Sequence, residues 1–413
     1  MSFYCIGEKL GHSYSVEIHE LLGNSDYRLK EIPPDGLEDF IRSKKYEGLN
    51  VTIPYKEKVM PFLDHIDPEA LAIGCVNTIV NKDGALYGCN TDFFGMTKLI
   101  GKAGITIAGK TVAVLGTGGT SKTARAVAKS LGAADVLIVS RRPGEGEISY
   151  DGLTERRGDI NIIINTTPVG MYPNEGKKPV DPAIFPSLSG VIDAVYHPFR
   201  TELIDSAEKC GIPARSGLYM LVSQAVKASE HFLKREYSDK DIDSVYAKML
   251  RKKSNIVLIG MPGSGKSTVG RIVAERLRLD HYDSDKLFVE RAGMPIPEYF
   301  AANGEAAFRK EESKIIKELS SGHGSVISTG GGVILDEGNM TALRRNGTIV
   351  FLDRPLEKLA GYKGRPLTPD FDSMKKKYEE RYELYLRYAD VVIKVNGSPS
   401  DTAEKVISGT EAK

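Results

Sequence analysis

The chain has 413 residues, more than one hydrophobic core usually organises, so we expect two or three domains. Its composition, 41% hydrophobic and 27% charged, is typical of a globular protein and excludes a largely disordered chain. The formal net charge is only +1, which gives no broad positive field for nucleic acid or for an anionic membrane. Small molecules are therefore the expected ligands.

The cysteines and the apolar segments bear on where the protein works. Its four cysteines, at positions 5, 75, 89 and 210, form no C-x-x-C pair and have no regular spacing, so reduced thiols are expected. No apolar run reaches the roughly 18 residues of a membrane-spanning helix, and the first residues do not follow a signal-peptide pattern. We therefore expect a cytoplasmic protein.

Two stretches each combine a short β-branched run, a glycine cluster and a helical pattern. The first covers residues 111–131 and the second covers residues 256–277. This order is typical of a strand, a phosphate-binding loop and a helix. The glycine spacings differ between the two stretches, so we predict two unrelated nucleotide sites rather than a repeat.

The segment between these stretches contains a candidate domain boundary. Residues 234–254 are rich in charge, and residues 239–250 have the pattern of an amphipathic helix. The basic residues 251–253 and Ser254 are predicted to form a short exposed connection, because three cations beside a boundary are typical of a solvated linker. We place the boundary near Lys252.

The second stretch contains the most specific motif in the sequence. Residues 260–267 read GMPGSGKS and fit G-x-x-x-x-G-K-[ST] between a predicted strand and helix. Backbone N–H groups of such a loop surround phosphate oxygens, its lysine reaches the outer phosphates, and its last hydroxyl can ligate Mg²⁺. The motif therefore predicts an ATP site with Mg²⁺ at Ser267. The predicted ATP-binding residues of the loop are Gly260, Gly263, Ser264, Gly265, Lys266, Ser267 and Thr268.

A guanine-specific site is disfavoured. Residues 81–84 read NKDG, but they have the wrong spacing for a guanine-reading motif, precede the P-loop and are typical of a hairpin turn. A GTPase is therefore not the preferred interpretation.

The first stretch has a weaker glycine pattern, because Ser121 stands where a dinucleotide-binding fingerprint has its third glycine. The next predicted strand, residues 135–139, leads into Ser140, Arg141 and Arg142. An NAD-binding fold has an acid there for the ribose hydroxyls, whereas cations suit a 2′-phosphate. The pattern therefore favours NADP(H) as the cofactor.

Residues 254–409 resemble shikimate kinase in the order of their motifs. Beyond the P-loop these motifs are HYDSD at 281–285, GEAAFR at 304–309, GGG at 330–332, RPL at 365–367 and RYELY at 381–385. The resemblance implies that Asp283 supports Mg²⁺ and that Asp285 accepts hydrogen bonds from substrate hydroxyls near the reacting oxygen.

The same resemblance implies roles for arginines and glycines. Arg309 and Arg381 would bind the substrate carboxylate, for which a planar guanidinium can donate two parallel hydrogen bonds. Arg365 stands at the position of the family's lid arginine, which would neutralise charge on the transferred phosphoryl group and contact ATP. The backbone would approach the substrate ring at Gly330, Gly331 and Gly332.

Residues 1–237 resemble shikimate dehydrogenase. The motifs that carry the resemblance lie at residues 7–19, 50–56, 74–78, 88–92 and 217–225, and Val16 stands where a proline is usual. The resemblance implies that Lys56 and Asp92 form a proton-transfer pair at the reacting carbonyl. Such a pair suits the reaction, because hydride transfer to a ketone leaves an alkoxide that an ammonium group can stabilise and protonate.

The resemblance also implies the remaining substrate and cofactor contacts. Ser13 and Ser15 would donate to the substrate carboxylate, while Thr52, Asn77 and Gln224 would bind or support ring hydroxyls. Motifs at 165–171 and 193–198 would line the nicotinamide cleft. The implied cofactor-binding residues are Gly116, Gly118, Gly119, Ser140, Arg141, Arg142, Thr166, Tyr196, Gly217 and Met220.

Histidines at 12, 19 and 197 are expected to be packed or hydrogen-bonded, because none has a partner at metal-ligand spacing. We therefore predict neither a histidine metal site nor a histidine base.

Together the two resemblances imply an α/β protein with three lobes. Residues 1–101 with 218–250 would form a substrate-binding lobe, 102–217 a Rossmann NADP-binding lobe, and 254–413 a P-loop kinase domain with a parallel sheet. The implied reactions are reduction of 3-dehydroshikimate with NADPH and phosphorylation of shikimate with ATP and Mg²⁺. Two alternatives stay open, a quinate-type dehydrogenase joined to an unrelated kinase and a nucleotide-responsive binding protein without turnover.

Overall fold

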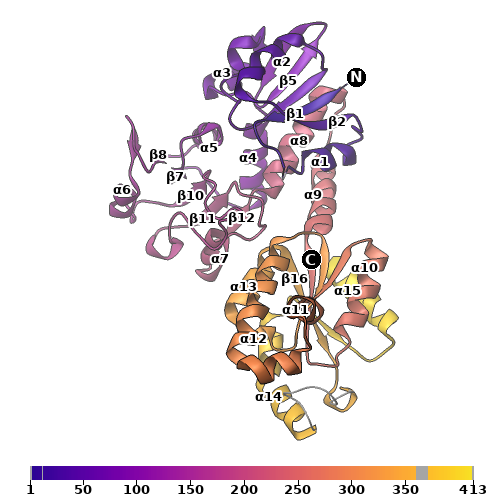
Figure 1. Cartoon of the computed structure of the whole chain (residues 1–413). Helices are drawn as coiled ribbons and strands as arrows, with labels where there is room; N and C mark the ends of the chain where they lie inside the picture. The colour runs from indigo at the N-terminus through magenta and orange to yellow at the C-terminus, as the bar shows by residue number, and fades with distance from the viewer. Residues whose placement is uncertain (1, 12, 360–370, 412–413) are drawn as a thin grey trace. The chain divides into compact units, whose positions relative to one another are not determined.

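The structure is a computed structural model that describes residues 2–11, 13–359 and 371–411. The chain forms two compact units, Met1–Met249 and Leu250–Lys413 (Figure 1). Both units combine helices with largely parallel sheets, which confirms the predicted α/β class. None of the helices in the described ranges is both long and apolar enough to cross a membrane.

The first sheet of the first unit has the strand order β2-β1-β3-β5-β6-β4. Its strands are β1 (Phe3–Gly7), β2 (Tyr27–Glu31), β3 (Gly48–Val51), β4 (His65–Ile66), β5 (Thr78–Lys82) and β6 (Ala85–Cys89). The helices around it are α1 (Ser15–Leu21), α2 (Leu37–Ser43) and α3 (Pro68–Ile73). Strands β5 and β6 form a hairpin through Asp83 and Gly84, both at positive φ, as the NKDG segment predicts.

The second sheet has the order β12-β11-β10-β7-β8-β9, and all its strands are parallel. The strands are β7 (Thr111–Leu115), β8 (Asp135–Val139), β9 (Glu147–Ile148), β10 (Ile162–Asn165), β11 (Gly190–Asp193) and β12 (Ala214–Ser216). Helices α5 (Gly119–Ser130), α6 (Tyr150–Glu155) and α7 (Glu202–Lys209) connect them. The order reverses at β7, so the glycine loop that follows β7 lies at the switch point where such sheets bind dinucleotides.

Two long helices, α4 (Thr91–Lys102) and α8 (Leu218–Leu233), pack side by side within the first unit (Figure 1). They approach most closely at Gly95, where an added Cβ would lie 2.7 Å from Met220 O and 3.0 Å from Gln224 Cβ. Both helices carry candidate site residues, Asp92 on α4 and Gln224 on α8. Their close packing therefore fixes the spacing of those residues.

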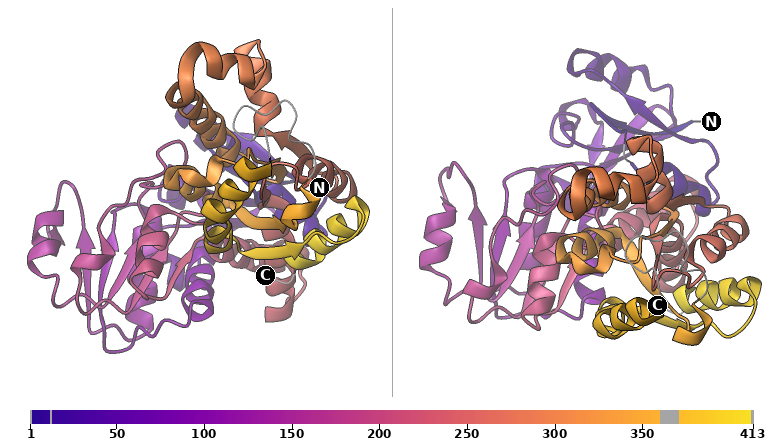
Figure 2. Two further views of the ribbon diagram at one scale, coloured as in Figure 1. Left: turned by 90° about the horizontal axis from the view of Figure 1, so that it is seen from below. Right: turned by 60° about the horizontal axis from the view of Figure 1, so that its bottom comes forward.

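The second unit has a five-stranded parallel sheet in the order β14-β15-β13-β16-β17. The strands are β13 (Asn255–Ile259), β14 (Asp280–Asp283), β15 (Ser325–Ser328), β16 (Gly347–Asp353) and β17 (Val391–Lys394). Helices cover both faces of this sheet (Figure 2). The helices are α10 (Lys266–Leu277), α11 (Ser284–Ala292), α12 (Ile296–Ser321), α13 (Glu337–Asn346), α14 (Phe371–Tyr388) and α15 (Pro399–Glu411).

The central strand β13 explains how this core forms. Val257 and Ile259 pack with residues of α12, α13 and α14, whereas Ile256 and Leu258 pack with residues of α10 and α15. Successive side chains of a strand point to opposite faces, so an unbroken apolar run suits a strand with helices on both sides. Short 3₁₀ turns complete both units at Pro34–Gly36, Met60–Phe62, Pro182–Ile184, Val333–Leu335 and Leu356–Lys358.

The predicted connection after residue 250 is wrong in its conformation, although Arg251 and Lys252 are exposed as expected. Helix α9 (Asp239–Lys253) runs through the unit boundary, so the basic triplet is helical. Arg251 forms an ion pair with Glu411, and Lys253 is buried rather than exposed. Basic side chains in the last turn interact favourably with the carbonyl end of a helix, which explains why this triplet extends the helix.

We expect Gly95→Ala to lower the free energy of unfolding by roughly 1–3 kcal/mol, because the added methyl would force α4 and α8 apart. Gly101→Ala is the matched control in the same helix, since a Cβ there meets nothing within 4 Å. The control should be neutral or more stable by about 0.5–1 kcal/mol. Urea unfolding of both variants tests this, and equal effects would contradict the close packing.

Candidate active sites

The first candidate site is built around a buried ion pair. Lys56 Nζ donates a hydrogen bond to Asp92 Oδ2 at 2.6 Å, and the two side chains are only 13% and 8% exposed. Burial opposes the charge of Lys56, but the charge of Asp92 and its hydrogen bond outweigh burial and raise the pKa of the lysine. Lys56 is therefore a protonated donor at neutral pH. Asp92 lies in the first turn of α4, which Asn90 caps by accepting a hydrogen bond from Phe93 N at 3.2 Å.

The predicted ring-hydroxyl residues Asn77 and Gln224 come together across 147 positions of sequence. Asn77 Nδ2 donates to Thr91 Oγ1 at 3.1 Å and lies 3.5 Å from Gln224 Oε1. Asn77 Oδ1 accepts from Thr91 N at 2.7 Å. The sequence interpretation did not single out Thr91, although it directly precedes Asp92.

Ser13 and Ser15 approach the same region. Ser13 Oγ donates to Ser15 Oγ at 3.0 Å. Burial raises the pKa of the neighbouring Cys5 thiol to about 11, while hydrogen bonds with Tyr27 and Ser15 and the charge of Lys56 act in the opposite direction. The Cys5 thiol thus lies close enough to Ser15 for a hydrogen bond and close enough to Lys56 to interact with its charge. Thr52 lies beside Gly7, where a Cβ would meet the Thr52 methyl group at 2.7 Å.

The buried His19 is connected to this site by hydrogen bonds. His19 Nε2 lies 3.1 Å from Asn50 Oδ1, and its Nδ1 lies 2.9 Å from Ser229 Oγ. Because a carbonyl oxygen only accepts, Nε2 carries the proton and Nδ1 accepts from the serine. Burial lowers the pKa of His19 to about 3, so the ring is neutral. Asn50 donates in turn to Thr78 Oγ1 at 3.0 Å, beside Asn77.

The candidate cofactor loop is shaped by glycines and by a serine. Gly116 has a φ of 111°, and Ser121 Oγ donates to Gly116 O at 2.6 Å, so this serine holds the loop where a third glycine is absent. Gly118 precedes α5, whose first residue is Gly119. A Cβ on Gly119 would lie 3.4 Å from Lys56 Cδ. The nucleotide loop and the ion pair therefore adjoin.

The other predicted cofactor residues surround the carboxyl ends of the second sheet. Thr166 Oγ1 donates to Leu115 O at 2.6 Å, and a Cβ on Gly217 would collide with Ala194 O. Met220 is buried and Tyr196 is half-buried. Arg141 and Arg142 are exposed after β8, where the hydroxyl of Ser140 accepts from Arg142 N at 3.2 Å.

The second candidate site is a pocket of about 720 Å³ lined by the P-loop, which follows the carboxyl end of β13. Its P-loop has Gly260, Gly263 and Gly265 at positive φ, and Lys266 Nζ donates to Gly260 O at 2.8 Å. The pocket brings together the predicted residues Gly263, Gly265, Lys266, Ser267, Thr268, Asp283, Asp285, Arg309, Gly330, Gly331, Gly332 and Arg381. The predicted Ser264 is buried within the same loop. Arg365 and His12 lie outside the described residues.

The acids and the glycines of this pocket make close contacts with neighbouring groups. Asp283 Oδ1 accepts from the backbone N–H groups of Asp285 at 3.1 Å and Lys286 at 3.2 Å, which caps α11. A Cβ on Gly330 would lie 2.6 Å from Asp285 Oδ1, and one on Gly332 would collide with the Arg309 guanidinium. Backbone without side chains therefore borders the charged groups.

The two predicted clamp arginines are held by different partners. Arg309 donates to Glu312 at 2.7 Å, and the Glu312 side chain is only 5% exposed. Burial raises the pKa of Glu312, against the opposing charge of Arg309. Arg381 donates to Gly331 O at 3.1 Å, and this carbonyl also accepts from Tyr385 OH at 2.7 Å.

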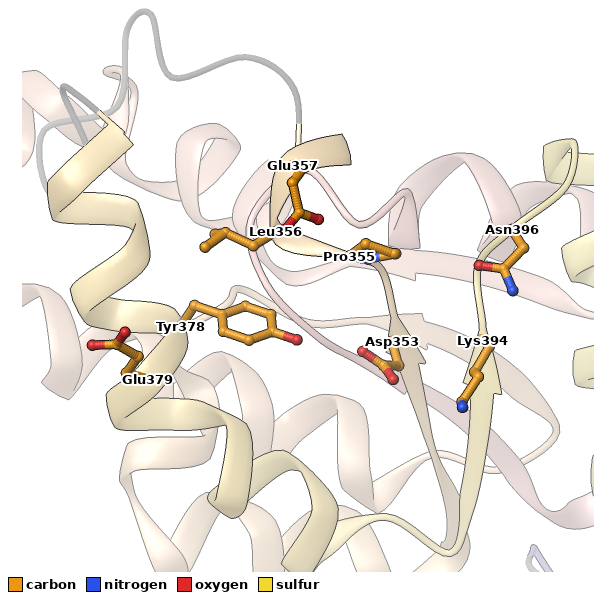
Figure 3. Close-up of a pocket in the computed structure, with 8 residues that line it drawn as sticks. All are labelled: Asp353, Pro355, Leu356, Glu357, Tyr378, Glu379, Lys394 and Asn396. Atoms are coloured by element: carbon orange, nitrogen blue, oxygen red, sulfur yellow. The ribbon is translucent and has the colours of Figure 1, made fainter.

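Some pocket residues were not predicted, namely Thr329, Glu312, Arg354 and Lys377. The spacing of Glu312 three residues after Arg309 on a helix is a signal that could have identified it. A second pocket in the same unit was also not predicted (Figure 3). It lies where β16 and β17 end beside α14, and the hydroxyl of Tyr378 points toward Asp353.

Asp193, at the end of β11, is fully buried near the candidate nicotinamide cleft. It accepts hydrogen bonds from Thr201 Oγ1 at 2.7 Å, Asn165 Nδ2 at 2.9 Å and Val195 N at 3.0 Å. Burial outweighs these hydrogen bonds and raises the pKa of Asp193 from 3.8 to about 6.

Because this pKa is raised in the folded state, the contribution of Asp193 to stability is complete below about pH 4 and is lost as pH rises through about 6. In the parent chain we expect the free energy of unfolding to fall by roughly 1–3 kcal/mol between these pH values as Asp193 ionises. Asp193→Asn should abolish this fall. Denaturant unfolding at pH 4.5 and at pH 7 measures it. Asp26→Asn, at an exposed site, is the control. Parallel pH profiles for parent and Asp193→Asn would contradict the expectation.

Comparisons with known proteins cover both units. Residues 5–79 match the family described as shikimate dehydrogenase substrate binding domain, and residues 262–411 match the shikimate kinase family. A shikimate dehydrogenase (NADP(+)) of Clostridium perfringens is 40% identical over 246 residues, which are 55% of this chain and 90% of that protein.

Solved structures resemble the first part of the chain. Shikimate dehydrogenase 1 from Peptoclostridium difficile is 38% identical with a TM-score of 0.55, and the match covers 60% of this chain and 98% of that one. A chorismate mutase/shikimate 5-dehydrogenase fusion protein from Clostridium acetobutylicum is 36% identical with a TM-score of 0.56, covering 60% and 97%. These matches and the kinase match together span most of the chain.

Proposed function

We propose that this chain, which belongs to the shikimate dehydrogenase family in its first unit and carries a shikimate kinase domain in its second, is a bifunctional enzyme. The first unit reduces 3-dehydroshikimate to shikimate with NADPH, and the second transfers a phosphoryl group from ATP to the 3-hydroxyl of shikimate. Its ligands are therefore small molecules, and its working compartment is the cytoplasm, where both nucleotides are available.

The observation that carries the reductase assignment is the buried Lys56–Asp92 pair beside Gly119 of the nucleotide loop. NADPH, when bound, supplies the hydride for the ketone carbon. Lys56 donates its proton to the ketone oxygen as negative charge develops there, and Asp92 holds the ammonium in place. A proton from water then restores Lys56. Ser13 and Ser15 bind the substrate carboxylate, while Thr52, Asn77 and Gln224 orient the ring.

The residues around the first nucleotide loop fit NADP(H). Gly116 and Gly217 let the backbone pack closely on neighbouring segments, because a side chain there would collide with Thr166 or with Ala194 O. The amino end of α5 offers N–H groups to a pyrophosphate. Arg141 and Arg142 would bind the 2′-phosphate, and Thr166, Tyr196 and Met220 would border the nicotinamide.

The kinase assignment rests on the charges that converge in the P-loop pocket. Lys266 stabilises the transferred phosphoryl group, and Asp285 orients the attacking hydroxyl and accepts its proton. Arg309 and Arg381 bind the substrate carboxylate. Ser267 and Asp283, the latter through water, would hold Mg²⁺, whose preference for oxygen ligands they fit; the ion supplies charge neutralisation at the phosphates. Arg365 would act from the lid.

We expect the two activities to be separable by single substitutions. Lys56→Ala should lower the rate of reduction by about 10²–10⁴-fold, because a positioned proton donor is lost, and leave phosphorylation unchanged. Asp285→Asn should do the converse. Lys58→Ala and Asp280→Asn, at exposed positions close in sequence, are matched controls. Steady-state kinetics of both reactions on purified chains test this.

A parent chain without turnover of either substrate but with retained NADPH and ATP binding would support the binding-protein alternative instead. Turnover of quinate in place of shikimate would support the other alternative. If Lys56→Ala abolished both activities in a folded chain, the assignment of two independent sites would fail.

We also expect NADPH to be preferred over NADH, and Arg141→Asp to reverse the preference. A guanidinium contact to the 2′-phosphate should contribute roughly 1.5–3 kcal/mol, or about 10- to 150-fold in kcat/KM. Specificity constants for both cofactors measure it. Arg157→Asp is the control, because Arg157 is an exposed arginine that follows α6 in the same unit. Equal constants for the two cofactors in the parent would rule out the role of Arg141.

A further inference from the structure

Arg354 occupies a position at the P-loop that the sequence motifs do not explain. It directly follows β16, the strand that pairs with β13, and it lines the P-loop pocket. Its Nη1 lies 3.4 Å from Gly263 O. Asp353 and Pro355, its neighbours in sequence, line the separate pocket of Figure 3, as expected when successive residues point to opposite sides.

Within the part of the chain that the structure describes, little compensates the charge of the Arg354 guanidinium. Its contact with Gly263 O is longer than an ordinary N–H···O hydrogen bond and involves a neutral acceptor. The Nε–H group is enclosed and has no partner within residues 2–11, 13–359 and 371–411, and no carboxylate there forms an ion pair with this side chain. The Arg354 side chain is half-buried, and a cation partly removed from water is stabilised by an accompanying anion. The missing partner is therefore expected to be an anionic group of a ligand.

The charges of the pocket indicate which group that is. Five basic side chains line it against three acids: Lys266, Arg309, Arg354, Lys377 and Arg381 against Asp283, Asp285 and Glu312. Arg309 is already paired with Glu312. Arg354 contacts the P-loop itself, through Gly263, whose neighbouring N–H groups and Lys266 form a phosphate-binding loop.

We propose that Arg354 is a further nucleotide-binding residue that contacts the phosphates of ATP at the Gly263 side of the P-loop. This inference rests on the proposed kinase function and deepens it. A guanidinium suits this position because it keeps its charge when half-buried and donates in a plane to phosphate oxygens. On binding, the phosphates provide an anion that the described residues do not offer to Arg354, and charge-assisted hydrogen bonds supplement the long contact to Gly263 O.

Binding of ATP and of inorganic triphosphate, each with Mg²⁺ and without acceptor, tests the proposal by calorimetry on the full chain. Arg354→Gln should weaken both ligands by about 10- to 100-fold, the effect of losing a hydrogen bond to a charged group. Arg354→Lys keeps the charge and should retain part of the affinity. Arg291→Gln, which removes an exposed arginine paired with Glu318 outside the pocket, should leave both affinities unchanged.

Three results would overturn the proposal: unchanged affinity for both ligands in Arg354→Gln, weaker ATP binding with unchanged triphosphate binding, or an Arg354→Lys variant no better than Arg354→Gln. The second result would assign the contact to the adenosine part. Reductase activity of the same chain reports whether each variant is folded and active in its first unit, and the thermal unfolding profile reports on the second.

The measurement also separates this inference from the proposed function. If the parent chain binds ATP but does not phosphorylate shikimate, the kinase assignment fails while the binding comparison still decides the role of Arg354. If shikimate is phosphorylated and Arg354→Gln binds both ligands normally, the inference fails alone.

Discussion

The ion pair of Lys56 and Asp92 is the interaction on which the first unit's site depends. Two charges removed from water are tolerated only when their geometry and hydrogen bonds compensate for lost hydration, and their 2.6 Å contact meets that requirement. The pair joins the segment after β3 to the first turn of α4. Helix α4 packs on α8, and Lys56 adjoins Gly119. The Lys56–Asp92 contact therefore connects the first sheet, the helix pair and the nucleotide loop.

In the second unit, charged groups are compensated in a different way. Its basic groups surround a pocket, and among the described residues Arg309 is paired with Glu312. Glu312 holds Arg309, whereas Arg381 rests on the carbonyl of Gly331. In the first unit the protein itself supplies the counter-ion of Lys56. In the second unit we infer that the substrates supply much of the negative charge.

Sequence reasoning succeeded where the chemistry is local. The eight residues of the P-loop predict their own conformation, because glycine spacing, a preceding apolar strand and a following helix lie within one segment. Contacts across long separations were beyond it unless a family resemblance suggested them. Asn77 meets Thr91 and Gln224 through packing that no periodicity reveals, and the chain from His19 through Asn50 depends on which buried groups face one another.

The errors have physical causes as well. The basic triplet after residue 250 has the composition of a linker, but helix propagation and a favourable helix terminus outweigh that tendency. Arg354 belongs to no motif, and only the tertiary structure shows that it lines the P-loop pocket while Asp353 and Pro355 line another pocket. The roles assigned to individual site residues remain predictions.

Helix α9 has a consequence for how the cell handles the protein. It contains the unit boundary within continuous helical backbone, and Lys253 at its end is buried. Proteases need extended, accessible chain, so the junction offers them a poor substrate. The two catalytic units are then made and degraded together, and their copy numbers stay at one to one without any control over separate genes.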